Sequence, residues 1–251
     1  RTVRDLALML GAMAGYDAAD PTTSVLPVPD YAAALTGDVK GLRVGLLRAH
    51  FTDVAAPEVR AAVEAAAKQL ERAGAVVDEV SLAEVVHVAA ASFAIVATEA
   101  LAYHAEWMRT RSADYQPDVR ERLRMGALVS GLQYVRAQQV RQLARREVDA
   151  ALARRDVLLA PATPIPAPRL GEKETELGDG KSDVRAALIR FTRPFNFSGH
   201  PACSVPCGFT AAGLPIGMQL VGRPFDEATV LRAADAYQRI SDWHARRPVL
   251  A

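Results

Sequence analysis

Residues 42–80 read LRVGLLRAHFTDVAAPEVRAAVEAAAKQLERAGAVVDEV, and the fold class that we predict follows from this segment. Leu42–Leu47 is a short apolar run of strand length. Pro57–Ala73 is predicted to be a helix, because proline suits its first turn and Gly74 suits its end. Ala75–Val80 is predicted to be a second strand. Two strands that flank one helix form a βαβ unit, so we expect a parallel sheet in an α/β fold.

The rest of the chain continues the alternation of helices and strands. In the first helix, Leu6, Met9, Leu10 and Met13 share one apolar face, and Gly15 can end the helix. We further expect helices at Glu84–Thr110, Pro117–Arg155, Ala186–Phe191 and Glu227–Ile240, strands at Val157–Ala160, Ala202–Val205 and Ile216–Val221, and loops at 16–41 and 171–181. The loop at 171–181 is polar and glycine-rich, so we expect it to be exposed and mobile. No linker separates independent cores, so we predict one domain with a mixed, largely parallel central sheet covered by helices.

The overall composition argues against nucleic acid and membrane partners. The chain has 251 residues, of which 50% are hydrophobic and 24% are charged, and its formal net charge is +1. This balance gives no electrostatic reason to bind nucleic acid or a membrane surface. The apolar run nearest to a transmembrane helix, 85–102, contains His87, Ser92, Thr98 and Glu99, so we expect a buried helix instead. The one basic cluster is interspersed with acidic residues and has the pattern of a solvated helix face: Arg136, Arg141, Arg145, Arg146, Arg154 and Arg155.

The two cysteines and five histidines indicate neither a disulfide framework nor a metal centre. Cys203 and Cys207 lie four residues apart in a predicted strand, where roughly 13 Å would separate them, against the ~6 Å that a disulfide needs. Reduced thiols of this kind fit a cytoplasmic protein. His200 lies close by, but no acidic partner lies at a telling position, so we interpret both cysteines as buried structural thiols. The histidines are scattered without metal-ligand spacing, and we expect no metal and no organic cofactor.

The beginning of the chain predicts a longer natural protein. The first residue is Arg1 rather than methionine, and Thr2 with Asp5 three residues later is close to a capping box. Proteins seldom begin on a helix cap. We therefore expect the natural chain to start upstream of Arg1.

Several motifs together resemble the amidase signature family across essentially the whole chain. Their order and spacing carry the resemblance more than any single motif does. They are RTVRDLA (1–7), GYD (15–17), PATP (161–164), FTRPFN (191–196), GHPA (199–202), VPCGF (205–209) and GLPIGMQLVGRPFDE (213–227). The resemblance implies the fold predicted above, and it places residues 1–251 in the C-terminal portion of a single amidase domain.

The chemistry that this resemblance implies uses a Ser, cis-Ser, Lys triad on a loop rich in glycine and serine. A buried, neutral lysine takes a proton through one serine, and the other serine attacks the amide carbonyl. Backbone N–H groups of the same loop stabilise the resulting oxyanion. No such run occurs in this sequence, and Ser198-Gly199 is not its equivalent. We therefore expect no catalytic residue here, an inactive fragment, and a missing N-terminal half of the same domain as its partner.

The same resemblance identifies five residues of this chain as candidates for binding a small-molecule amide substrate: Arg122, Thr163, Phe195, Asn196 and Gln219. Phe195, Gln219 and the turn at Thr163 and Pro164 equally fit a purely structural role, since such turns serve packing as often as chemistry. Arg122 matches an arginine that binds the glutamine carboxylate in tRNA amidotransferase A subunits. It also fits a solvated helix arginine, because Arg120 and Arg124 flank it.

Three functions stay open at this point. The first is hydrolysis of a carboxamide to a carboxylic acid and ammonia or an amine. The second is the A subunit of a tRNA-dependent glutamine amidotransferase, against which Ile189 argues, since it occupies the position of an aspartate that binds the glutamine amino group. The third is a non-catalytic binding or assembly protein. The sequence identifies no particular amide, and it leaves a homodimer open.

Overall fold

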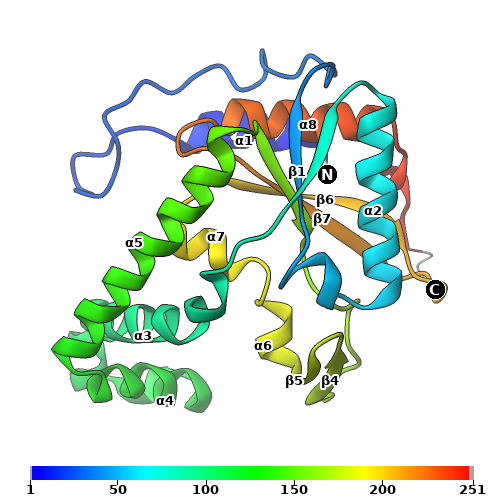
Figure 1. Cartoon of the computed structure of the whole chain (residues 1–251). Coiled ribbons are helices and arrows are strands. Elements are labelled where there is room, and N and C mark those ends of the chain that lie inside the picture. Colours follow the sequence, from blue (N-terminus) through cyan, green and yellow to red (C-terminus); the bar gives the residue numbers. More distant parts are fainter. Residues whose placement is uncertain (1, 249–251) are drawn as a thin grey trace.

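A five-stranded sheet forms the centre of the computed structural model, which describes residues 2–248 (Figure 1). The strand order is β2 (Val76–Val80), β1 (Arg43–Leu47), β3 (Val157–Pro161), β7 (Pro215–Val221) and β6 (Ala202–Phe209). β1 pairs in parallel with β2 and with β3, whereas β7 pairs antiparallel with β3 and with β6. Only β7 therefore runs against the other strands of this sheet. The mixed, largely parallel sheet is confirmed.

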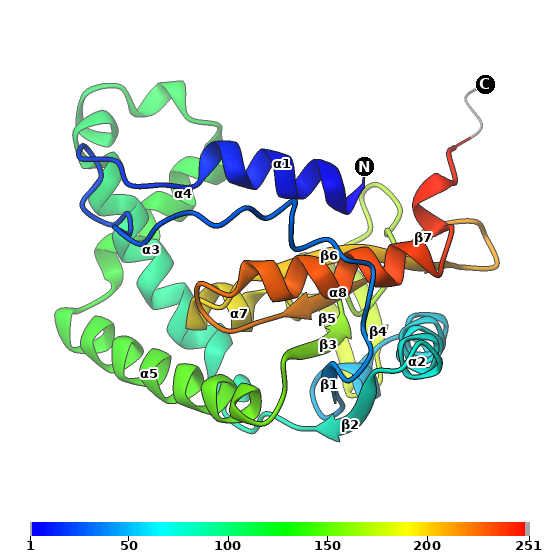
Figure 2. The same ribbon diagram turned by 90° about the horizontal axis from the view of Figure 1, so that it is seen from above.

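Two helices pack on the sheet beside each other, and a third covers one of them. The helices α2 (Pro57–Arg72) and α8 (Glu227–Arg239) both contact β6 and β7, and α1 (Val3–Met13) lies along α8 (Figure 2). The apolar positions of α2 recur every three or four residues, so Val59, Val63 and Leu70 point to the sheet and are fully buried. Proline at its first turn and Gly74 after its end, at φ +102°, delimit α2 as the sequence predicts.

A second group of helices extends away from the sheet (Figures 1 and 2). It consists of α3 (Val85–Thr110), α4 (Pro117–Met125), α5 (Gly131–Ala153) and the short α7 (Arg193–Ser198). This group has a small core of its own, formed by Val88, Ala91, Ile95, Ala137, Ala144 and Phe197.

The predicted helix Pro117–Arg155 is wrong in one respect, because it is divided into α4 and α5. A 3-10 turn at Gly126–Leu128 ends α4, and Ser130 then caps α5. The Ser130 hydroxyl accepts the Gln133 N–H, and the Gln133 side chain accepts the Ser130 N–H, which makes a capping box. The chain therefore changes direction between two helices.

Two more local predictions need correction. The segment 171–181 is not a simple loop: β4 (Glu174–Leu177) and β5 (Gly180–Asp183) form an antiparallel hairpin. The predicted helix Ala186–Phe191 is observed as α6 (Val184–Leu188), which the Asp183 side chain caps, and α7 follows it. Alternating residues and a short turn are typical of a hairpin, but the glycines and charged residues of this segment are equally typical of a loop.

Two helices bury different surfaces from those expected. In α1, Val3 and Ala7 are buried, whereas Leu6, Met9 and Met13 are 44%, 59% and 71% exposed. The helix α3 is long and apolar enough to cross a membrane by length and composition alone, and 22% of its most apolar window is buried. It is therefore not the buried helix that we expected, because α4, α5 and α7 cover only part of its circumference.

Candidate functional site

The candidate site is a cavity near β1, where successive connections of the chain lead to strands on opposite sides of that strand. From β1 the chain passes through α2 to β2 on one side, and it returns through α3, α4 and α5 to β3 on the other. In open α/β sheets, ligands bind in the crevice outside the carboxyl ends of strands at such a switch point. The segments that follow β1 and β3 are joined here, because the Ala56 N–H donates to the Pro164 carbonyl at 2.8 Å.

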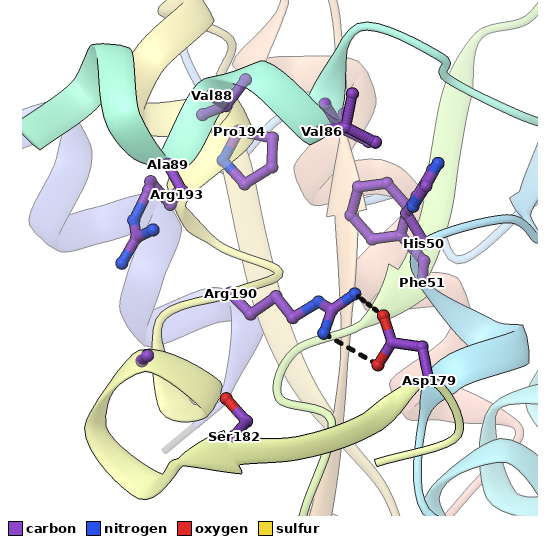
Figure 3. Close-up of a pocket in the computed structure, with 12 residues that line it drawn as sticks. His50, Phe51, Val86, Val88, Ala89, Asp179, Ser182, Arg190, Arg193 and Pro194 are labelled. Atoms are coloured by element: carbon purple, nitrogen blue, oxygen red, sulfur yellow. Dashed lines mark hydrogen bonds and ion pairs between the residues drawn. The ribbon is translucent and has the colours of Figure 1, made fainter.

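Five segments far apart in the sequence line this cavity, which has a volume of about 400 Å³ (Figure 3). They are the segment after β1, the first turn of α3, the hairpin, α6, and the stretch from Arg190 into the first turn of α7. The lining residues are His50, Phe51, Val85, Val86, Val88, Ala89, Asp179, Ser182, Ala186, Arg190, Arg193 and Pro194. A cavity of this size with a mostly apolar wall and a few charged groups suits a small molecule.

The apolar wall is fixed by an aromatic cluster. Phe51 is buried, and its ring lies 5.4 Å from the ring of Phe191 and 5.8 Å from that of Phe195, centroid to centroid. Packed aromatic rings at such separations stabilise one another beyond simple burial. His50, the residue before Phe51, has φ +66°, a left-handed conformation that costs free energy for a residue with a side chain. The direction of His50 into the cavity is therefore set by the backbone.

The charges in the cavity are unevenly paired. Arg190 donates two hydrogen bonds to Asp179, one of them 3.1 Å long between Nη1 and Oδ1. This guanidinium holds the pKa of the Asp179 carboxyl below its ordinary value. Arg193 has no hydrogen bond or ion pair from its side chain among residues 2–248, and partial burial lowers the pKa of its guanidinium. One cation in the cavity is therefore left without a counter-charge.

Gln219 and Phe195 lie behind the cavity wall and do not line the cavity itself. Gln219 is 2% exposed, and its Nε2 donates to the carbonyls of Pro161 and Phe191, both at 2.9 Å. Phe195 is 1% exposed and stacks on Phe51. Gln219 therefore joins the end of β3 to the segment before α7, and Phe195 joins α7 to the segment after β1. Direct contact with a substrate stays a prediction for both.

The other three predicted residues lie apart from the cavity. The Thr163 hydroxyl is half-buried in the turn after β3 and donates to the Ile165 carbonyl at 2.8 Å. Asn196 is exposed on α7. Arg122 is exposed on α4 and pairs with Asp118 one turn away, at 3.2 Å. Their roles in binding an amide also stay predictions. The sequence did not single out His50, Asp179, Arg190 or Arg193, because only the fold brings them together.

A Ser–His–Asp chain of hydrogen bonds occurs elsewhere, and no sequence motif indicates it. The Ser198 hydroxyl lies 2.8 Å from His200 Nδ1, and His200 Nε2 lies 3.1 Å from Asp149 Oδ1. Since a carboxylate only accepts, Nε2 carries the proton and Nδ1 accepts from Ser198. Burial lowers the pKa of His200 despite the carboxylate. Ser198 is 1% exposed and does not line the cavity, so this chain of bonds holds α7 against α5.

The two cysteines are free and buried in β6, as predicted. Burial raises the pKa of Cys203 to about 11 and that of Cys207 to about 12, so neither is a reactive thiolate near neutral pH. Within residues 2–248, no group of three or more His, Cys, Asp or Glu side chains is arranged to hold a metal ion.

Comparison with known proteins identifies a consistent set of relatives. The family profile described as Amidase matches residues 1–231. The chain is 43% identical to the A subunit of glutamyl-tRNA(Gln) amidotransferase from Chloroflexus aggregans, over 100% of this chain and 55% of that protein. It is 44% identical to an amidase of Pseudomonas putida, over 100% of this chain and 54% of that protein. The chain thus spans about half the length of the curated relatives that it matches.

Solved structures agree with these relatives. The fold resembles a chain of a vestigial protein complex that reveals the evolutionary origins of an s-triazine catabolic enzyme, with a TM-score of 0.85 and 35% identity. That match covers 95% of this chain and 51% of the other. A bacterial aryl acylamidase of the amidase signature family has a TM-score of 0.83 and 27% identity, covering 99% of this chain and 55% of the other.

Proposed function

This chain belongs to the amidase family, and from that we propose that it forms one wall of the substrate pocket in an enzyme that hydrolyses a carboxamide to a carboxylic acid and ammonia or an amine. The observation that carries the proposal is the cavity at the switch point of the sheet. Its position, its volume of about 400 Å³ and its mixture of aromatic and charged lining suit a small amide.

The catalytic groups of the proposed reaction come from outside residues 1–251. Ser182 lines the cavity, but its hydroxyl donates to the adjacent Asp183 carbonyl at 3.2 Å, and no hydrogen bond joins it to a base within residues 2–248. A serine without a base in reach is a weak nucleophile. We therefore assign the Ser, cis-Ser, Lys loop to another part of the enzyme, which packs against this cavity.

Within this proposal, the chain orients the substrate instead of attacking it. The aromatic cluster around Phe51 excludes water from one side, and the Gln219 hydrogen bonds keep the turn after β3 in register with the segment before α7. Fixed positioning of this kind contributes to catalysis by holding the amide carbonyl where the nucleophile and the oxyanion donors can reach it. No metal or organic cofactor takes part.

The proposal is tested by fusing this chain to the part of a relative that has no counterpart in residues 1–251. We expect the 251 residues alone to show no turnover of acetamide or benzamide above the uncatalysed rate. Fusion to the part of the Pseudomonas putida amidase that lies outside the matched region is expected to produce turnover, measured as ammonia release. Turnover by residues 1–251 alone would contradict the proposal. A fusion protein that is folded but releases no ammonia from these two amides or from a carboxylate-bearing amide such as succinamate would also contradict it.

A second candidate is the A subunit of a tRNA-dependent glutamine amidotransferase, because several relatives with about the same identity carry that name. Ile189, which is 44% exposed, has no group that could accept a hydrogen bond from an ammonium. A glutaminase assay on the completed enzyme distinguishes the two functions. An amidotransferase is expected to release ammonia from free glutamine, whereas a site with Ile189 in place of an ammonium acceptor is not. A non-catalytic assembly role, a cytoplasmic location and a homodimer stay proposals without an observation that favours them.

A further inference from the structure

The imbalance of charge in the cavity points to the chemistry of its ligand. Three of the lining residues are basic and one is acidic: His50, Arg190, Arg193 and Asp179. Asp179 already forms an ion pair with Arg190, so its negative charge is neutralised. Arg193 stands on the side of the cavity near Ala89, while Asp179 and His50 lie on the opposite side (Figure 3). The uncompensated positive charge is therefore localised at one end of the cavity.

Arg193 is also held in place by its backbone. It is the first residue of α7, its N–H donates to the Ile189 carbonyl at 3.0 Å, and Pro194 follows it with a fixed φ. Its side chain is half-buried rather than spread into solvent. A partly desolvated guanidinium without an anion is a costly arrangement, which a bound anion relieves. Arginine binds planar carboxylates through two parallel N–H···O bonds, and Arg190 binds Asp179 in this manner within the same cavity.

We propose that Arg193 binds a carboxylate of the substrate, so that the site takes short amides that carry a carboxylate, such as the monoamides of dicarboxylic acids. This inference rests on the proposed function and adds a substrate class to it. The carboxylate lies at the Arg193 end of the cavity. The amide then extends along the apolar wall formed by Phe51 and Pro194.

Direct binding to the 251-residue chain tests the inference without any need for turnover. Isothermal titration with succinamate is compared with titration of its methyl ester, which has the same amide and no charge. We expect succinamate to bind at least tenfold more tightly than the ester. Arg193→Gln is expected to weaken succinamate binding about ten- to hundredfold, the range for losing charge-assisted hydrogen bonds, and to leave ester binding unchanged.

Two further variants distinguish an effect of charge on binding from damage to the fold. Asp179→Asn frees Arg190 from its partner, so we expect it to strengthen succinamate binding about threefold or more. Any general disruption of the cavity would have the opposite effect. Arg109→Gln removes an exposed arginine that pairs with Glu106 on α3 and does not line the cavity, and it is expected to change the binding of neither ligand.

Equal affinity for the acid and the ester, no binding of succinamate, or an unchanged affinity in a folded Arg193→Gln variant would each overturn the inference. Inorganic phosphate that displaces succinamate with higher affinity would also overturn it, because the site would then select a phosphate group. These outcomes can be distinguished from a failure of the proposed function. If the completed enzyme hydrolyses neutral amides and binding shows no preference for an anion, only the proposed substrate class is wrong. If succinamate binds as expected and no amide is hydrolysed, only the proposed function is wrong.

Discussion

Replacing Gln219 with leucine is expected to lower the free energy of unfolding by about 2–4 kcal/mol. Gln219 is 2% exposed, and its side-chain amide donates to both the Pro161 and the Phe191 carbonyls. Leucine has a similar volume but no donor, so both buried carbonyls lose a hydrogen bond without access to water. The measurement is urea unfolding followed by circular dichroism, with the slope m compared to confirm that only stability changes.

The matched control is Gln139→Leu. Gln139 is exposed on α5 and has no hydrogen bond from its side chain among residues 2–248, so its replacement is expected to change stability by no more than about 0.5 kcal/mol. If Gln219→Leu is as harmless as this control, Gln219 does not hold the two segments together. Its role would then be contact with substrate alone, the other function that the sequence left open.

Replacing Gly126 with alanine is expected to destabilise the fold by about 2–3 kcal/mol, although alanine is the better helix former. A Cβ at this position would lie 2.2 Å from the Ala97 carbonyl oxygen and 2.8 Å from Leu101 Cβ. The backbone of α3 is in the way, so the two helices have to separate. Because the turn at Gly126–Leu128 connects α4 to α5, thermal unfolding should show a lower midpoint for the variant.

Gly131 provides the control for this second substitution. It lies in the first turn of α5, and a Cβ there would meet nothing within 4 Å. Gly131→Ala is therefore expected to raise stability by about 0.5 kcal/mol, through the reduced freedom of the unfolded chain. Opposite signs for the two glycines confirm that close packing against α3, rather than helix propensity, requires Gly126. A stable Gly126→Ala variant would show that α3 and α4 are not packed in this way.

Much of the fold could be predicted because local signals and tertiary packing agree. The strand–helix–strand segment 42–80 has clear boundaries at Pro57 and Gly74, and the structure reproduces it to within one residue at each end. The division of the predicted helix Pro117–Arg155 could not be predicted in the same way. Gly126 is conformationally acceptable in a helix, and its backbone lies so close to Ala97, far away in the sequence, that a side chain would not fit there.

The exposed helices illustrate a second limit of prediction from the sequence. Apolar periodicity in α1 favoured the face with Met9 and Met13, but α8 covers the face with Val3 and Ala7 instead. The apolar face of α3 is likewise more exposed than its composition suggests. Sequence patterns indicate which residues tend to be buried, but they do not specify which neighbouring element buries them.

The candidate site was the least predictable part. Motifs drew attention to Phe195 and Gln219, which support the cavity from behind. The residues that line it come from five separate segments, and Arg193 stands out only once Asp179 is seen to be occupied by Arg190. A single arginine in a sequence carries no sign of whether it has a partner.

Labelling with a fluorophosphonate tests most directly whether the nucleophile lies outside this chain. An activated serine displaces fluoride from such a probe and forms a stable phosphonate ester, which peptide mass spectrometry locates. We expect no adduct on any residue of the 251-residue chain and, in the completed enzyme, one adduct on a serine of the added part. An adduct on a side chain of this chain, such as Ser182 at the cavity or Ser198 beside His200, would contradict this assignment.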